Sequence, residues 1–191
     1  MTRILTFDQS TKVNGWALYD TESPVSAIRC GSFVLSGDTI SEKIRSLRHH
    51  VRAIIKEEKP DFCVFEAPAD DVRSYEKKTT DMYGQTTVDS AINARSSLML
   101  HDIAGALEVI ILGCGIECER VRPQTWQVVI PKAIKGKGKG KEAAKDRVRQ
   151  FCDRFQIIGK NADARDAAVI AIWAAGRSQV LKLSKMTGRA A

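Results

Sequence analysis

The chain has 191 residues, 43% of them hydrophobic, and a formal net charge of +7. A chain of this length buries roughly 70% of its extended surface and supports one full core, so we expect one domain at residues 1–176, followed by a basic tail at 177–191. No apolar run approaches the roughly 18 residues of a membrane-spanning helix, and Met1-Thr2-Arg3 shows no leader pattern, which predicts a cytoplasmic protein. The positive charge favours a polyanionic partner, most commonly nucleic acid, over a membrane surface.

The cysteines are odd in number and contain no CxxC pair, which argues against a disulfide scaffold and against a zinc ribbon. Cys114 and Cys118 could in principle share a metal, but no second ligand pair with suitable spacing follows them. Buried, reduced thiols explain all five more simply.

The first part of the chain predicts a set of antiparallel strands. Residues 3–8 and 16–19 are expected to be two strands of a hairpin, because the segment between them carries turn chemistry. Residues 27–35 are a plausible third antiparallel strand. Apolar residues then recur at helical spacing between Asp38 and Glu58, which predicts an amphipathic helix.

A short apolar strand follows this helix. Residues 61–66 are bounded by Pro60 and Pro68, as expected of a buried central strand, and Glu66 is its last residue. Residues 70–87 are polar and weakly periodic, and we expect a mobile loop or a frayed helix there.

The rest of the chain predicts alternating helices and one further strand. Residues 90–112 form a long helix that Gly113 and Gly115 terminate, and residues 116–121 return to the sheet as a fifth strand. A short helical turn at 123–126 and helices at about 141–155 and 161–175 complete the fold.

Four acidic residues stand at the ends of these elements. Asp8 closes the first strand, Glu66 closes the central strand, and Asp163 and Asp166 share one face near the start of the last helix. Strand ends can converge on one small volume, where carboxylates repel one another unless divalent cations separate them. The pattern therefore predicts a metal site.

Each acid also has a simpler interpretation. Asp163 and Asp166 could merely complement the helix dipole behind an Asn161 cap, and Asp8 could serve a turn. Glu66 is harder to dismiss, because a charge beside a buried strand is tolerated only when it is paired or metal-bound.

Residues 132–147 carry most of the excess charge, with seven basic and two acidic residues and a local charge of +5. The glycines are expected to keep the alternating Gly-Lys run mobile, so that lysines contact successive phosphates without reading bases. The alternative is a solvated loop that contacts nothing. The predicted DNA-binding residues are Lys132, Lys135, Lys137, Lys139, Lys141 and Lys145.

The order of these parts resembles the RuvC-type Holliday junction resolvases of the RNase H-like superfamily, over residues 3 to about 175. The resemblance rests on Phe7-Asp8-Gln9-Ser10-Thr11, Gly15-Trp16, Val64-Phe65-Glu66, the basic segment 138–145, and Ala162-Asp163-Ala164-Arg165-Asp166-Ala167. It implies an α/β fold with a five-stranded mixed sheet flanked by helices.

The resemblance also implies a function. The protein would be a homodimeric endonuclease that cuts four-way junctions or other branched DNA in recombination and repair, leaving 5′-phosphates. Its expected location is the cytoplasm, associated with the nucleoid, or the host cytoplasm for a phage-encoded protein. The long helix 90–112 would supply the dimer interface through Ala91, Ala94, Leu98, Ile103, Ala104 and Leu107, although packing on its own sheet explains these residues equally well.

The same resemblance assigns roles to the acids. Two Mg²⁺ ions, for which Mn²⁺ could substitute, would be held by Asp8 as the bridging ligand together with Glu66, Asp163 and Asp166. Lys145 would lie near the phosphate and offset its charge.

The sequence departs from the family pattern in three places. Gln9-Ser10 follows Asp8 where a glycine is usual, which implies a different turn. Trp126 occupies the place of a lysine after the fifth strand. Bacterial members of the family carry an aromatic wedge residue just after the central strand. It has no counterpart at residues 68–71, and whether Tyr75 or Tyr83 replaces it is open.

Three other functions compete with this one. An actin-like sugar kinase or ATPase shares the opening but needs a second related domain, which 191 residues do not provide. A nuclease for RNA-DNA hybrids would carry its glutamate on the first helix, whereas Glu66 ends a strand. A non-catalytic basic DNA-binding module would use the acids only structurally.

Overall fold

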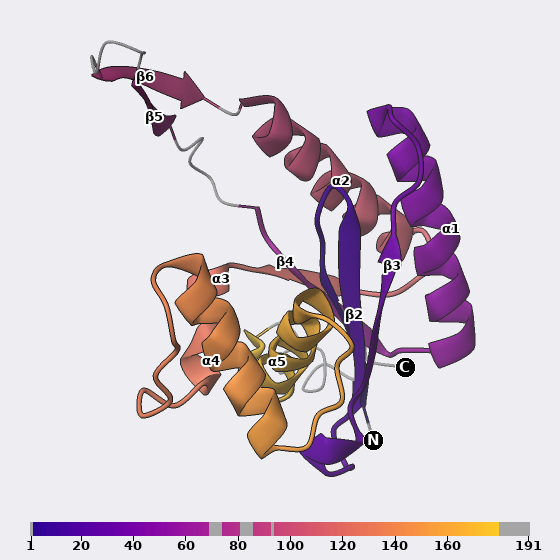
Figure 1. Ribbon diagram of the computed structural model, residues 1–191. Helices are drawn as coiled ribbons and strands as arrows, with labels where there is room; N and C mark the ends of the chain where they lie inside the picture. Colours follow the sequence, from indigo (N-terminus) through magenta and orange to yellow (C-terminus); the bar gives the residue numbers. More distant parts are fainter. Residues whose placement is uncertain (1, 69–73, 81–85, 93, 180–191) are drawn as a thin grey trace.

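A mixed five-stranded sheet forms the centre of the protein (Figure 1). The structure is a computed structural model that describes residues 2–68, 74–80, 86–92 and 94–179. The strand order is β3-β2-β1-β4-β7, and the predicted five-stranded mixed sheet flanked by helices is confirmed. The strands are β1 (Arg3–Asp8), β2 (Val13–Asp20), β3 (Arg29–Val34), β4 (Phe62–Glu66) and β7 (Cys118–Val121).

The pairing of the strands brings two acidic residues to one edge of the sheet. β2 runs antiparallel to both β1 and β3, as the turn residues predict, and Asp8 pairs with Gly15 of β2. β4 runs parallel to β1, with Phe7 opposite Phe65, and β7 runs parallel to β4. The carboxyl ends of β1 and β4 therefore lie side by side, and each ends in a carboxylate.

Helices cover both faces of the sheet (Figure 1). One face packs against α1 and α2, and the other packs against α5, with α4 beside it. Among the described residues, we find no helix with both the length and the apolarity to cross a membrane. The helices are α1 (Ile40–Glu58), α2 (Ala94–Leu112), α3 (Pro123–Trp126), α4 (Lys141–Arg154) and α5 (Ala162–Arg177), with 3₁₀ turns η1 (Val25–Ala27) and η2 (Gln127–Val129).

The alternation of side chains along β1 decides which helix layer each residue meets. Leu5 and Phe7 are buried in the core that α1 and α2 form with the sheet. Ile4 belongs to the core on the α5 side, and the buried Thr6 hydroxyl donates a hydrogen bond of 2.7 Å to the Ala167 carbonyl of α5. Because successive residues of a strand point to opposite faces, Asp8 lies on the α5 side.

One predicted segment differs from the structure. The region expected to be a loop or frayed helix contains β5 (Ser74–Thr80) and β6 (Thr86–Ile92), which pair antiparallel as a separate two-stranded sheet. The long helix consequently begins at Ala94 rather than at residue 90. Each strand contains two β-branched threonines, which favour extended backbone even where the polar pattern hides it. Tyr75 lies in β5, whereas Tyr83, the tail beyond residue 179 and parts of this region lie outside the described residues.

Candidate metal centre

Three of the four acids meet at the edge of the sheet. Asp8 at the end of β1 and Asp163 and Asp166 near the start of α5 each place one carboxylate oxygen within 4.8 Å of the other two. All three residues are half-buried. Residues more than 150 positions apart in the sequence thus share one small volume, as the pattern of strand and helix ends predicts.

Gly15 makes this convergence possible. A Cβ atom on Gly15 would lie 2.0 Å from the backbone oxygen of Asp163, well inside any permitted contact. Only glycine lets α5 approach β2 this closely. Since Gly15 pairs with Asp8, the same close approach sets Asp163 beside the end of β1.

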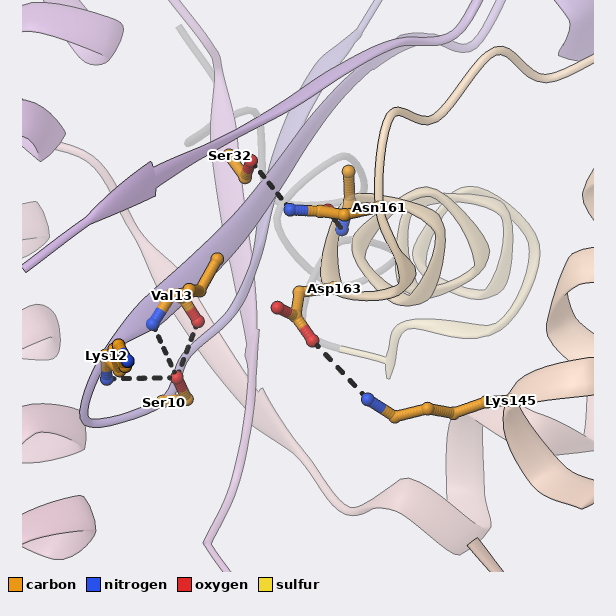
Figure 2. Close-up of polar contacts among 8 residues, drawn as sticks. Ser10, Lys12, Val13, Ser32, Lys145, Asn161 and Asp163 are labelled. Carbon is orange, nitrogen blue, oxygen red and sulfur yellow. Dashed lines mark hydrogen bonds and ion pairs between the residues drawn. The ribbon is translucent and has the colours of Figure 1, made fainter. Parts of the chain in front are cut away.

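The start of α5 is tied to the sheet by its cap residue. The Asn161 side-chain oxygen accepts a hydrogen bond from the Ala164 N–H (2.9 Å), which is the predicted N-cap. The Asn161 amide nitrogen donates to the Ser32 hydroxyl on β3 at 2.8 Å (Figure 2). The first turn of α5 is therefore held in place from both sides, and the positions of Asp163 and Asp166 follow from it.

Glu66 borders the three aspartates and is held by Trp126. The Trp126 indole Nε1 donates a hydrogen bond of 2.7 Å to Glu66 Oε2, and Trp126 is buried. Among the described residues, Glu66 is not one of the group within 4.8 Å, but its charge raises the pKa of both Asp8 and Asp166. It is thus the fourth acid of the centre, with one oxygen already bonded.

The role of Trp126 is not visible in the sequence. By its place in the family pattern, Trp126 stands only where a lysine is usual. One general signal was available, because a buried indole N–H almost always finds an acceptor, and Glu66 is the acid at the end of the neighbouring strand. α3, which begins at Pro123 just after β7, carries the indole to that carboxylate.

Lys145 supplies a positive charge from α4. Its ammonium nitrogen lies 3.9 Å from Asp163 Oδ1 (Figure 2), and its charge lowers the pKa of Asp8 and Asp166. The side chain is 56% exposed, so a phosphate in solution can reach it. The structure therefore places Lys145 at the rim of the acidic cluster.

The turn after Asp8 is built by side chains where the family pattern has a glycine. The Ser10 hydroxyl accepts hydrogen bonds from the N–H groups of Lys12 (3.2 Å) and Val13 (3.0 Å) (Figure 2). Asn14 closes the turn by bonding to the Ser10 backbone in both directions. The buried Gln9 amide donates to the Glu66 carbonyl, which ties the ends of β1 and β4 together.

The acidic cluster carries a large electrostatic cost. Burial, followed by the charges of Glu66, Asp166 and Asp163, raises the pKa of Asp8 well above its usual value. Burial raises the pKa of Glu66 to about 7, and burial together with the Glu66 charge raises that of Asp166 to about 7. One lysine does not offset four carboxylates, so the cluster has room for further positive charge. Carboxylate oxygens are the ligands that Mg²⁺ prefers, and the residues present fit such an ion.

The Gly-Lys segment is exposed but is held against α4. The Lys137 N–H donates to Asp146 Oδ2 (2.8 Å), and the Gln150 amide donates to the Lys135 carbonyl (3.0 Å). A Cβ on Gly136 would lie 1.8 Å from the Ala143 oxygen, and Gly138 and Gly140 have positive φ angles of 91° and 56°. The glycines thus allow close packing and tight turns, and the mobility expected from the sequence stays a prediction. The predicted lysines all lie exposed: Lys132, Lys135, Lys137, Lys139, Lys141 and Lys145.

The apolar face of α2 is largely used inside the chain. Ile103, Ala104 and Leu107 are fully buried in the core beneath α1 and α2, while Leu98 is 61% exposed. The side chains of Ala91 and Ala94 lie outside the described residues. Packing on its own sheet therefore accounts for the buried part of the predicted interface helix.

Among the comparisons with known proteins, the one with solved structures identifies the fold. No protein-family model and no curated protein matches the sequence. Among solved structures, Thermus thermophilus RuvC in complex with a Holliday junction substrate matches with a TM-score of 0.57 at 13% identity, over 91% of this chain and 95% of that one. A second T. thermophilus RuvC structure matches with a TM-score of 0.53 at 14% identity, over 92% and 97% of the two chains.

A eukaryotic resolvase has the same arrangement. The yeast mitochondrial Holliday junction resolvase Ydc2 matches with a TM-score of 0.51 at 14% identity, over 92% of this chain and 77% of that one. The chain therefore has the RuvC-type, RNase H-like fold, and the resemblance seen in the sequence is confirmed at the level of the fold.

The raised pKa values predict how the metal-free protein responds to pH. Glu66 and Asp166 bind their protons more tightly in the folded chain, with pKa values of about 7, than in the unfolded chain, with values of 4.5 and 3.8. Their contribution to the free energy of unfolding is complete below about pH 4 and is lost as the pH rises through 7. In chelator, we expect the melting temperature to fall by several degrees between pH 5.5 and 8, measured by differential scanning fluorimetry.

Asp166→Asn provides the control for this experiment. The amide cannot ionise, so its melting temperature should change less over the same pH range, and Mg²⁺ should stabilise the wild-type protein more at pH 8 than at pH 5.5. An equal decrease in both proteins would refute the electrostatic account.

The Trp126–Glu66 hydrogen bond predicts a second effect. Trp126→Phe keeps an aromatic ring but removes the donor that orients Glu66, and loss of such a supporting contact typically weakens metal binding by about tenfold or more. We expect this loss in a Mn²⁺ titration followed by calorimetry. Trp173→Phe is the matched control, because Trp173 is also buried in the core on the α5 side and loses the same volume. If the two variants bind Mn²⁺ equally well, Trp126 has only a packing role.

Proposed function

We propose that this protein is a metal-dependent endonuclease that resolves Holliday junctions or other branched DNA by hydrolysing phosphodiester bonds. The supporting observation is the convergence of Asp8, Asp163 and Asp166, with Glu66 beside them, at the edge of a RuvC-type sheet. One of the compared structures, that of T. thermophilus RuvC, holds a Holliday junction substrate, which makes branched DNA the first substrate to test.

Each of the four acids has its own role in holding the metal ions in this proposal. Asp8, at the end of the central strand β1, would hold the metal ions together with Glu66 and Asp166. Asp163 would bind one ion or orient its water. Two Mg²⁺ ions, or Mn²⁺ in their place, supply an activated water near neutral pH and offset the charge that develops on the phosphate.

The chain's other residues prepare the site for a phosphate. Lys145 at the rim attracts the scissile phosphate and offsets part of its charge, since it is exposed and lies 3.9 Å from Asp163. Trp126 holds one oxygen of Glu66 and leaves the other available. Gly15 and Asn161 keep the first turn of α5 in position, so the ligands need little rearrangement.

The exposed lysines of segment 132–145 bind the DNA backbone. Lys135 and Lys137 lie on a segment that is hydrogen-bonded to α4, and Lys141 and Lys145 lie on α4 itself. The Lys145 ammonium approaches Asp163, which supports a DNA path from the lysine segment to the metal centre. The protein acts as a homodimer in this proposal, so that two such centres cut two strands of a junction.

Two alternative functions predict different experimental results. A nuclease for RNA-DNA hybrids would cut a hybrid duplex in preference to a four-way junction. A non-catalytic DNA-binding module would bind DNA with its acids acting only in structure, and Asp8→Asn would leave every activity unchanged.

The decisive experiment compares substrates and variants. Purified protein is incubated with four-way, three-way, flap, linear and hybrid substrates in Mg²⁺ or chelator. We expect Mg²⁺-dependent cutting of the four-way junction, and a decrease of at least about a hundredfold in Asp8→Asn and Asp166→Asn. Both variants should retain junction binding, because they remove negative charge from the site of the phosphate.

Asp153→Asn controls for the loss of an acid elsewhere, since Asp153 is exposed on α4 and outside the cluster. It should cut at the wild-type rate. Undiminished cutting by Asp8→Asn, or preference for the hybrid, would refute the proposed activity.

The lysine segment predicts a separate change in affinity. Replacing Lys135, Lys137 and Lys139 by alanine should weaken junction binding and lower the slope of log affinity against log salt by about 2–3, because each lost phosphate contact contributes about 0.9. Fluorescence anisotropy at several NaCl concentrations, with Ca²⁺ in place of Mg²⁺, measures this. Unchanged affinity would exclude the segment from the DNA interface.

A further inference from the structure

A strongly basic groove lies where α1 meets the end of α2, on the face of the sheet opposite the metal centre. The cavity has a volume of about 730 Å³ and runs along α1 to the end of α2. We call it the α1 groove. The residues that line it are Arg45, Arg48, His49, Arg52, Ala53, Ile55, Lys56, Gly113 and Cys114.

The cations of the α1 groove form one continuous row. Arg45, Arg48, Arg52 and Lys56 are spaced by three, four and four residues, which places them on one face of the helix. The row spans about 16 Å, at 1.5 Å per residue. All four are exposed, while Leu47 and Val51 on the opposite side of α1 are fully buried in the core. The row is thus presented to solvent on a helix that packing holds rigidly.

No acidic residue among the described lining residues offsets this row. The Glu42 carboxylate accepts a hydrogen bond from Thr39 in the capping box of α1. This bond, together with the charge of Arg45, lowers the pKa of Glu42. Glu58 in the last turn of α1 is buried and pairs with Arg3 and Arg29 instead. Four like charges in one groove repel one another, and the arrangement is stabilised by a bound polyanion.

The position of the groove separates it from the site of cutting. Asp8 lies on the face of the sheet that α5 covers, whereas α1 and α2 cover the other face. Figure 1 shows α1 and α4 on opposite sides of the sheet. A straight duplex that lies along the metal centre and the lysine segment does not also run along the outer side of α1, but a branched substrate has further arms.

We propose that the α1 groove binds the phosphate backbone of a second duplex arm of the branched substrate. This inference rests on the proposed function and adds a contact surface to it. One guanidinium group can donate two parallel hydrogen bonds to one phosphate. Three of the four cations in the row are arginines. The contact selects branched over linear DNA by engaging two arms at once, and it reads no bases.

The test uses the full chain with Arg45→Gln, Arg48→Gln and Arg52→Gln combined. Glutamine keeps the helix propensity and removes three charges from exposed positions. In Ca²⁺, four-way junction affinity should fall about tenfold or more, and the salt slope should decrease by about 2–3. Affinity for a short linear duplex should fall by less than about threefold, as both contact surfaces act together only on a branched substrate. The single-turnover cutting rate at saturating protein should match the wild type.

A matched control removes the same charge elsewhere. Lys43→Gln, Arg154→Gln and Lys160→Gln combined change the net charge equally but leave the lining of the groove intact. This variant should retain near wild-type discrimination between junction and linear duplex. Equal losses in the two triple variants, or equal losses on both substrates, would overturn the inference.

Further outcomes separate this inference from the proposed function. A wild-type protein that cuts junctions, with a groove variant that binds them unchanged, removes the α1 groove alone from the interface. A groove variant with an altered oligomeric state by light scattering shows instead that a second copy of the chain occupies the groove. A wild-type protein that neither binds nor cuts branched DNA overturns the proposed function and the assignment of the groove together.

Discussion

The close approach of α5 to β2 at Gly15 is the constraint on which the candidate site depends. The Asp163 backbone occupies the space that any larger residue at position 15 would need. Because Gly15 pairs with Asp8, this contact brings an acid from the first strand together with two acids from the last helix. The Thr6–Ala167 hydrogen bond and the Asn161 cap hold the same contact from the strand and from the helix start.

The fold thereby concentrates negative charge in one place and distributes positive charge over the surface. Burial raises the pKa values of Asp8, Glu66 and Asp166, and repulsion from neighbouring carboxylates raises those of Asp8 and Asp166 further. Lys145 and the Trp126 indole reduce that cost without removing it. A cation bound among these carboxylates would lower the same cost and so would stabilise the folded chain at neutral pH. The basic lysine segment and the α1 groove lie on different sides of the sheet, which suits a substrate with more than one duplex arm.

The sequence predicted the strands and helices that carry the acids. β1, β4 and α5 have clear periodicity, and proline or asparagine marks where β4 and α5 begin. β5 and β6 were missed, because their polar residues show no alternation of apolar side chains and only their threonines favour extended backbone. The glycines of the lysine segment predict mobility, whereas the structure uses Gly136 for close packing on Ala143. Glycine serves flexibility and close contact equally well, and sequence alone does not distinguish them.

The sequence by itself determined the class of fold, the identity of the acids and the excess of positive charge, because these depend on local periodicity and composition. Only the tertiary structure decided that three aspartates lie within 4.8 Å of one another, that Trp126 holds Glu66, and that four cations of α1 form one groove. These are contacts between elements distant in the chain, and they depend on strand register, on the face to which each side chain points and on the space at Gly15. Local patterns do not encode those quantities, since they arise only when all the layers pack together.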